Sequence, residues 1–233
     1  MDIITPTGIT SVAWEGELVT PAVTMSPTAA RAIPVVTMGK PEIWPAARAL
    51  EIETGKKWTP PLGGADFWLV RLACTLREPG GLPTLTEAVQ TLYLRPRNSN
   101  ADAGAVYAHS LFPDRLTAED KSEFSATLGP ELKFGKDVSY KIGELGAKIE
   151  YRKVFPVIQS FDVGTATPYW VFRPHATHPL DGSQCVYAVV GAQAKSGGAR
   201  ASIELVVTAQ TRFGPVRFGL PEEAQAHTSF TIP

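Results

Sequence analysis

Residues 66–77 have the sequence DFWLVRLACTLR, in which side chains of alternating character follow one another along the chain. One side of this run consists of Trp68, Val70, Leu72, Cys74 and Leu76. This period of two predicts a β-strand, because successive side chains of a strand point to opposite faces of the sheet. The other side grades from Phe67 to Arg77, so we expect it to be covered at one end and to reach solvent at the other.

Strands of the same kind are predicted through the remainder of the chain. The run 87–95 follows a turn around Pro79–Gly81, and a long-loop hairpin is one arrangement for this pair. Residues 138–142 and 149–155 alternate on either side of the 143–146 turn and predict a hairpin with one face in water. Further strands are predicted at residues 169–173 and 213–218.

The clearest hairpin prediction joins residues 184–193 to residues 201–212 through the turn at Lys195–Ala199. In the second of these strands one face carries Ile203, Leu205, Val207 and Ala209, and the opposite face carries Ser202, Glu204, Thr208 and Gln210. This pattern predicts that only one face is buried for most of the strand's length. With at least seven strands and turn signals between them, we predict a mainly β protein, an antiparallel β-sandwich with one or two short helices.

The first 64 residues differ from the others, since they contain eight prolines and three tryptophans. Proline cannot donate to a central ladder, so we expect edge strands, turns or a polyproline-like strap here. We therefore divide the chain into a Pro-rich and Trp-rich segment, residues 1–64, packed on a β-sandwich domain, residues 65–233. A short helix is predicted from Pro45 through residues 46–53 to Gly55, because proline at a helix start and glycine after its end are favoured.

Residues 98–130 allow two interpretations. The segment Thr117–Asp120 resembles a capping box and indicates a helical turn within residues 116–122. Alternation of Phe124, Ala126 and Leu128 instead indicates a strand within residues 123–134. Both remain open at the level of sequence.

Charge and hydropathy restrict the class of partner. The formal net charge is −1 and no Lys/Arg cluster longer than a pair occurs, so we do not expect nucleic-acid binding. No apolar run approaches the roughly 18 residues needed for a membrane-spanning helix. The first residues lack the basic and apolar regions of a signal peptide, so we expect a cytoplasmic protein.

Cys74 and Cys185 each lie within an apolar, strand-like run. A small thiol packs there as an ordinary hydrophobic group, so we expect both to be reduced and structural. We predict no redox function.

One loop carries residue types that bind metals. His175, His178 and Asp181 follow one another at intervals of three residues between two predicted strands. Two imidazoles and a carboxylate suit a divalent metal such as zinc or iron. Pro174 and Pro179 make the loop irregular, however, and a solvated connection with a turn at Asp181–Gly182 is the alternative. We otherwise expect no cofactor.

The tryptophans are the other candidates for binding. Trp14, Trp44 and Trp58 lie in the Pro-rich segment, which either packs on its own domain or is offered to a partner. Trp68 and Trp170 lie within predicted strands, and we expect them in the core.

Three hypotheses of function follow. The first is a non-catalytic interaction or ligand-binding β-sandwich module, which binds a protein partner or itself, because no coherent catalytic set is visible. The second is a self-assembling structural subunit of the capsid or filament kind, in which Pro-rich arms are exchanged between neighbours. The third is a metal-dependent enzyme that uses the loop at residues 173–182. We rank them in this order.

Overall fold

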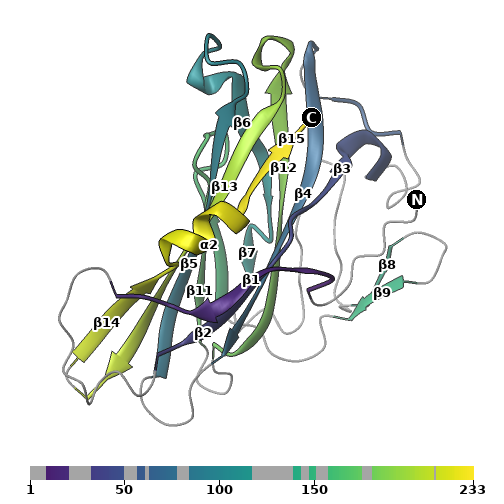
Figure 1. The fold of residues 1–233 in the computed structure, drawn as a ribbon. Coiled ribbons are helices and arrows are strands. Elements are labelled where there is room, and N and C mark those ends of the chain that lie inside the picture. Colours follow the sequence, from purple (N-terminus) through teal and green to yellow (C-terminus); the bar gives the residue numbers. More distant parts are fainter. Residues whose placement is uncertain are drawn as a thin grey trace.

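The computed structural model describes residues 9–20, 33–49, 57–60, 63–77, 84–116, 139–142, 147–150, 157–174, 180–212 and 214–233. These residues form two antiparallel sheets that pack face to face as a β-sandwich, as the sequence predicts. In Figure 1 the long strands run from top to bottom of the molecule and the short helix α2 crosses in front of them. Among the described residues, no helix combines the length and the apolar character that a bilayer crossing requires.

Sheet A has six strands in the order β1-β2-β4-β12-β6, with β3 also paired to β4. Their bounds are β1 Val12–Glu17, β2 Val35–Gly39, β3 Glu42–Pro45, β4 Ala65–Arg77, β6 Val106–Phe112 and β12 Gly182–Gln193. Strands β1 to β3 come from the Pro-rich segment, and β1 lies at an edge of the sheet. The described part of that segment is therefore built into the sandwich.

Sheet B has seven strands in the order β14-β13-β5-β11-β10-β7, with β15 also paired to β13. Their bounds are β5 Thr84–Pro96, β7 Arg115–Leu116, β10 Val157–Phe161, β11 Tyr169–Arg173, β13 Ala199–Thr211, β14 Gly214–Gly219 and β15 Ser229–Ile232. A separate pair consists of β8 Ser139–Ile142 and β9 Ala147–Glu150, which confirms that the predicted hairpin pairs there.

The helices are short. Residues 46–49 are helical directly after Pro45, in agreement with the predicted helix start, and residues 50–56 lie outside the described part. Two 3₁₀ turns, η2 Ala103–Ala105 and η3 Ala194–Ser196, connect strands. Helix α2, Glu222–His227, links β14 to β15. Both interpretations of residues 117–134 fall outside the described residues.

The core lies between the two sheets and is built from the alternating faces that the sequence predicts. In β13, Ile203, Leu205, Val207 and Ala209 are at most 3% exposed. In β4, Val70, Leu72, Cys74 and Leu76 have no exposed surface. Trp170 is fully buried, as expected, whereas Trp68 is half-buried and packs against the core. Removal of this apolar surface from water is the main term that stabilises the sandwich.

The predicted hairpin between residues 184–193 and 201–212 is wrong. Strand β12 pairs with β4 and β6 in sheet A, whereas β13 pairs with β5, β14 and β15 in sheet B. The connection at Gly197 and Gly198, both with positive φ, thus crosses from one sheet to the other. Both edges of β12 are already occupied within sheet A, so β13 has no edge there to join. The same is true of β4 and β5, which lie in different sheets and form no hairpin.

The second face of β4 also differs in part from the expectation. Arg77 is exposed, as predicted, but Arg71 is only 2% exposed. The Arg71 guanidinium forms an ion pair with Glu42 of β3, and the Thr10 hydroxyl donates to the same carboxylate at 2.9 Å. A buried charge requires such partners, and the ion pair between Arg71 and Glu42 joins β4 to β3.

Replacement of Val207 by Asp tests the facing of β13. Val207 has no exposed surface, so the new carboxylate would enter the core without a partner. We expect destabilisation on the order of 4 kcal/mol or more, with loss of cooperative thermal unfolding. Gln210→Asp in the same strand is the control, because Gln210 is exposed. A folded Val207→Asp protein with an unchanged melting temperature would contradict the facing.

Candidate functional site

A concave surface lies on sheet B, where two strands share one edge of β13. Strand β15 pairs with residues 199–202 of β13, and β14 pairs with residues 206–211. Helix α2 makes the link between them. Residues 203–205 of β13 therefore have no strand on this side, and the edge of the sheet is open there.

Hydrogen bonds fix both sides of this opening. The Thr228 hydroxyl donates to the Ile203 carbonyl oxygen at 3.1 Å, which satisfies an acceptor that a neighbouring strand would otherwise bond. On the other side, Val19 and Gly219 exchange two backbone hydrogen bonds, with N···O distances of 2.9 and 2.7 Å. The chain after β1 is thereby attached to β14, and the two sheets are joined at this edge.

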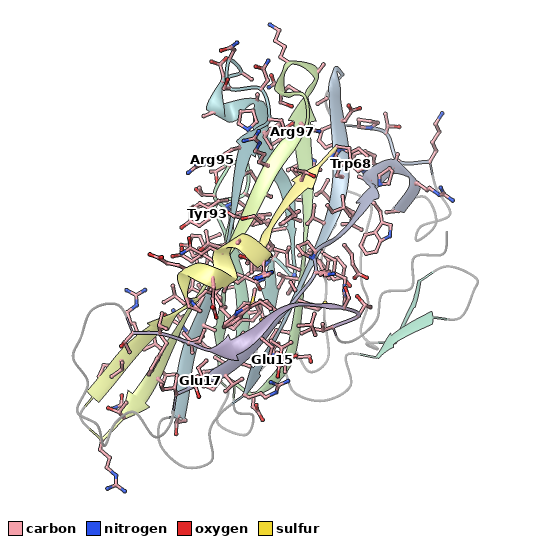
Figure 2. All side chains as sticks on the ribbon, in the orientation of Figure 1. Glu15, Glu17, Trp68, Tyr93, Arg95 and Arg97 are labelled. Carbon is pink, nitrogen blue, oxygen red and sulfur yellow. The ribbon has the colours of Figure 1, made fainter. Side chains whose placement is uncertain are left out.

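A groove with a volume of ≈ 670 Å³ occupies this place. The size is within the range of pockets that hold small ligands. It is lined by residues of β5, β13, β14, α2 and β15 together with the chain after β1: Val19, Tyr93, Ser202, Ile203, Glu204, Val206, Arg217, Phe218, Gly219, Leu220, Gln225 and Ser229. Figure 2 labels Tyr93 on the part of β5 that leads into this region.

A carboxylate of the groove is held by a phenol. The Tyr93 hydroxyl donates to Glu204 Oε2 at 2.6 Å, although the two residues are 111 positions apart in the sequence. They lie on β5 and β13, where Tyr93 is directly opposite Ser202 and therefore diagonal to Glu204. This hydrogen bond to Glu204 is the largest cause that raises the pKa of Tyr93, followed by burial and by the charge of the carboxylate.

The opposite charge lies toward the other end of the groove. Arg217 of β14 is exposed and is paired in register with Thr208, four residues beyond Glu204 on β13. Four residues of a strand span about 13 Å. The groove between the two charged groups is lined by the apolar side chains of Val206 and Val19, and Val19 is 46% exposed. The groove thus offers an anion, an apolar middle and a cation in sequence.

The residues of the predicted metal loop are placed only in part. Asp181 is exposed and directly follows the fully buried Leu180, while His175 and His178 lie outside the described residues. In the described part of the chain, no group of three or more His, Cys, Asp or Glu side chains is arranged to hold a metal ion. The metal site stays a prediction.

The N-terminal tryptophans contact the core of their own chain. Trp14 of β1 is 8% exposed and belongs to the core cluster. Trp44 and Trp58 are half-buried and pack against the cluster, and the Trp58 ring meets Phe67 edge-on with centroids 5.4 Å apart. Trp14 leaves little indole surface for a partner, whereas Trp44 and Trp58 retain part of theirs. A partner at these residues stays a prediction.

The two cysteines are free thiols. Cys74 is in register with Gln184, and Cys185 with Ala73, so the two thiols point to opposite faces of sheet A. Burial raises the pKa of Cys74 to about 12 and that of Cys185 to about 11, against a lowering by the Arg71 guanidinium in the second case. Thiols with such pKa values react poorly, because the thiolate is the nucleophile.

Comparisons with known proteins give no family. No family model matches the sequence, and no curated protein sequence matches it. Among solved structures, one that is similar is the Clostridium perfringens NetB toxin in the membrane-inserted form, with a TM-score of 0.33, 8% identity and coverage of 94% of this chain and 92% of that one.

A second match is a structure described as manganese lipoxygenase of Gaeumannomyces graminis with part of zonadhesin of Komagataella pastoris. It has a TM-score of 0.26 and 14% identity, and it covers 93% of this chain and 70% of that one. TM-scores this low support no inference about function.

The bond between Tyr93 and Glu204 is testable by pH titration. The raised pKa means that the phenol keeps its proton above the ordinary value of 10.0. The stabilisation that the bond gives is complete below the unfolded-state pKa and is lost as the pH rises through the folded-state value. We expect the Tyr93 signal, taken as the difference between wild type and Tyr93→Phe in ultraviolet absorbance, to titrate later than that of a free tyrosine.

Glu204→Gln is the matched variant, because it removes the charge and keeps the shape. We expect the Tyr93 titration to return toward its ordinary range. An identical titration in wild type and Glu204→Gln would contradict the contact.

Proposed function

We propose that this protein is a non-catalytic, ligand-binding β-sandwich module whose site is the groove beside α2. The observation that carries the proposal is the groove itself, ≈ 670 Å³ in volume and lined from five secondary-structure elements. A site that rests on several strands is held more rigidly than one built on a loop, which favours binding without a large ordering cost.

The groups in the groove suit a hydroxyl-rich ligand such as a sugar. The lining offers hydroxyls from Ser202 and Ser229, a carboxamide from Gln225, and the charged groups of Glu204 and Arg217. These donors and acceptors match a ligand that carries many hydroxyl groups. The C–H faces of a sugar ring match the apolar part of the groove at Val206 and Leu220.

The hypotheses of a self-assembling subunit and of a metal-dependent enzyme stay predictions from the sequence. The groove supports the binding module more directly, since its polar groups are of the kind that orient a bound molecule.

A side chain at position 219 tests the groove without altering the sheet. A Cβ added to Gly219 would meet no atom within 4 Å, and the backbone bonds to Val19 would remain. We expect Gly219→Leu to fill the groove. Saturation-transfer NMR with a panel of mono- and disaccharides should give signals with the wild type and lose about tenfold or more in affinity with the variant.

Gly63→Leu is the matched control, because a Cβ there also meets no atom within 4 Å and the residue precedes β4 of the other sheet. It should bind the same saccharides as the wild type. Equal binding by Gly219→Leu and the wild type, or no transfer from any saccharide to the wild type, would refute the sugar site.

A further inference from the structure

Two arginines stand directly opposite each other on the outer face of sheet B. Arg95 of β5 and Arg200 of β13 are partners in register, and both are exposed. Directly opposite residues of antiparallel strands have Cβ atoms about 5 Å apart, and like charges in such a pair destabilise the sheet. Replacement of either arginine would remove this repulsion and stabilise the sheet, so the presence of both suggests that the pair serves a function.

Neither guanidinium is neutralised within the described part of the chain. Among the described residues, no side-chain hydrogen bond or ion pair joins the guanidinium of Arg95 or of Arg200 to another group. Two carboxylates lie near by in sequence or register: Glu204 is bonded by Tyr93, and Asp102 is an exposed residue of the connection from β5 to η2. Neither of them is paired with the two arginines.

Two more cations belong to the same end of the sandwich. The backbone N–H of Arg97 donates to the Gly198 carbonyl at 3.1 Å, which continues the ladder of β5 and β13 beyond Pro96. Arg97 is exposed and lies two residues after Arg95, directly beyond the end of β5. Lys195 in η3 is held near by, because its carbonyl accepts from Asn98 Nδ2 at 3.1 Å. Figure 2 shows Arg95 and Arg97 above Tyr93, toward the upper end of the sheet.

This cationic cluster, defined as Arg95, Arg97, Arg200 and Lys195, borders the groove. Tyr93 and Ser202 line the groove and form the next outward-facing pair of the same ladder. One such step along a strand is about 7 Å. A ligand seated in the groove thus reaches the arginine pair with a single substituent.

We propose that Arg95 and Arg200 together bind a tetrahedral oxyanion, the phosphate or sulfate ester group of the ligand. An oxyanion between two guanidiniums replaces their repulsion by charge-assisted hydrogen bonds, and the planar fork of arginine suits two oxygens at once. Thr231 of β15 is in register with Arg200 on its other side and adds a hydroxyl donor. The inference extends the proposed function, since it names a charged group on the groove's ligand, but the oxyanion site itself uses residues outside the groove.

Inorganic pyrophosphate tests the oxyanion site alone. In calorimetric titrations at constant ionic strength, we expect pyrophosphate to bind the full chain with a dissociation constant of about 1 mM or lower. Arg95→Ala and Arg200→Ala should each weaken binding by about tenfold or more, because each removes charge-assisted hydrogen bonds. Arg212→Ala is the control, since Arg212 is an exposed arginine at the β13–β14 turn and loses the same charge.

A response to pyrophosphate equal to that of added chloride would overturn the proposal. Equal weakening by Arg212→Ala would also overturn it, because the effect would then be one of net charge only.

Arg200→Glu separates binding from folding. The new carboxylate faces Arg95, so the repulsion becomes an attraction, and we expect the melting temperature to stay equal or rise while pyrophosphate binding is lost. A lower melting temperature than the wild type would contradict the repulsion on which the inference rests.

A hexose 6-phosphate and a hexose 6-sulfate then identify the source of the oxyanion. Tighter binding of one ester than of the other, each lost in Arg200→Ala, names phosphate or sulfate, and equal binding supports recognition of the shared tetrahedral shape. If the esters bind no better than the free hexose, the proposal of an oxyanion site is refuted and the proposal of a sugar-binding groove is kept. If pyrophosphate binding depends on the arginines but Gly219→Leu leaves saccharide binding unchanged, the groove fails and the oxyanion site stands.

Discussion

The hydrogen bond from the Thr228 hydroxyl to the Ile203 carbonyl oxygen holds open the edge of β13 on which the candidate site depends. A sheet edge normally continues with one neighbour, but β13 has β14 along one half and β15 along the other. The interval between them must satisfy its backbone groups in another way, and the hydroxyl at the end of α2 does so. The helix can then leave the sheet and form one side of a groove, while the bonds between Val19 and Gly219 close the other.

The register of β5 against β13 determines which side chains lie opposite each other on the outer face of sheet B. Arg95 opposite Arg200 is followed by Tyr93 opposite Ser202, and Glu204 comes next on β13. The sheet thus sets two cations beside a groove that has its own carboxylate. The repulsion between the two arginines lowers the stability of the free protein, and a ligand that carries a negative charge would relieve it. Functional sites commonly lower the stability of a protein in this way.

Much of the fold could be predicted from the sequence, because the period of two is strong where one face is buried. The facing of β13 was recovered residue by residue, including Val207. The hairpin of β8 and β9 was predicted correctly, but those of β4 with β5 and of β12 with β13 were not, since alternation shows which face is buried and not which sheet the strand joins. The two strands differ in a way that was informative: β12 is buried on both faces for most of its length, whereas β13 alternates. A strand buried on both faces needs cover on both sides, whereas an alternating strand has one face in water, so the two patterns indicate different surroundings.

The site could not be predicted in the same way. Ser202 and Glu204 were correctly placed on the wet face of their strand, yet nothing in the sequence joins Glu204 to Tyr93, 111 residues away. Likewise Arg95 and Arg200 are far apart in the sequence and become a pair only through strand register. The metal site at His175, His178 and Asp181 is predicted only because these residues are close in sequence, and such spacing is weaker evidence for a site than proximity across paired strands.

Backbone ¹H–¹⁵N chemical shifts, recorded during titration with a hexose 6-phosphate, test the central claim most directly. The account predicts that the largest changes fall on Tyr93, Arg95, Arg200, Ser202 and Glu204, with sheet A unaffected. Changes centred on sheet A, or changes no larger than those caused by sodium chloride at the same ionic strength, would contradict it.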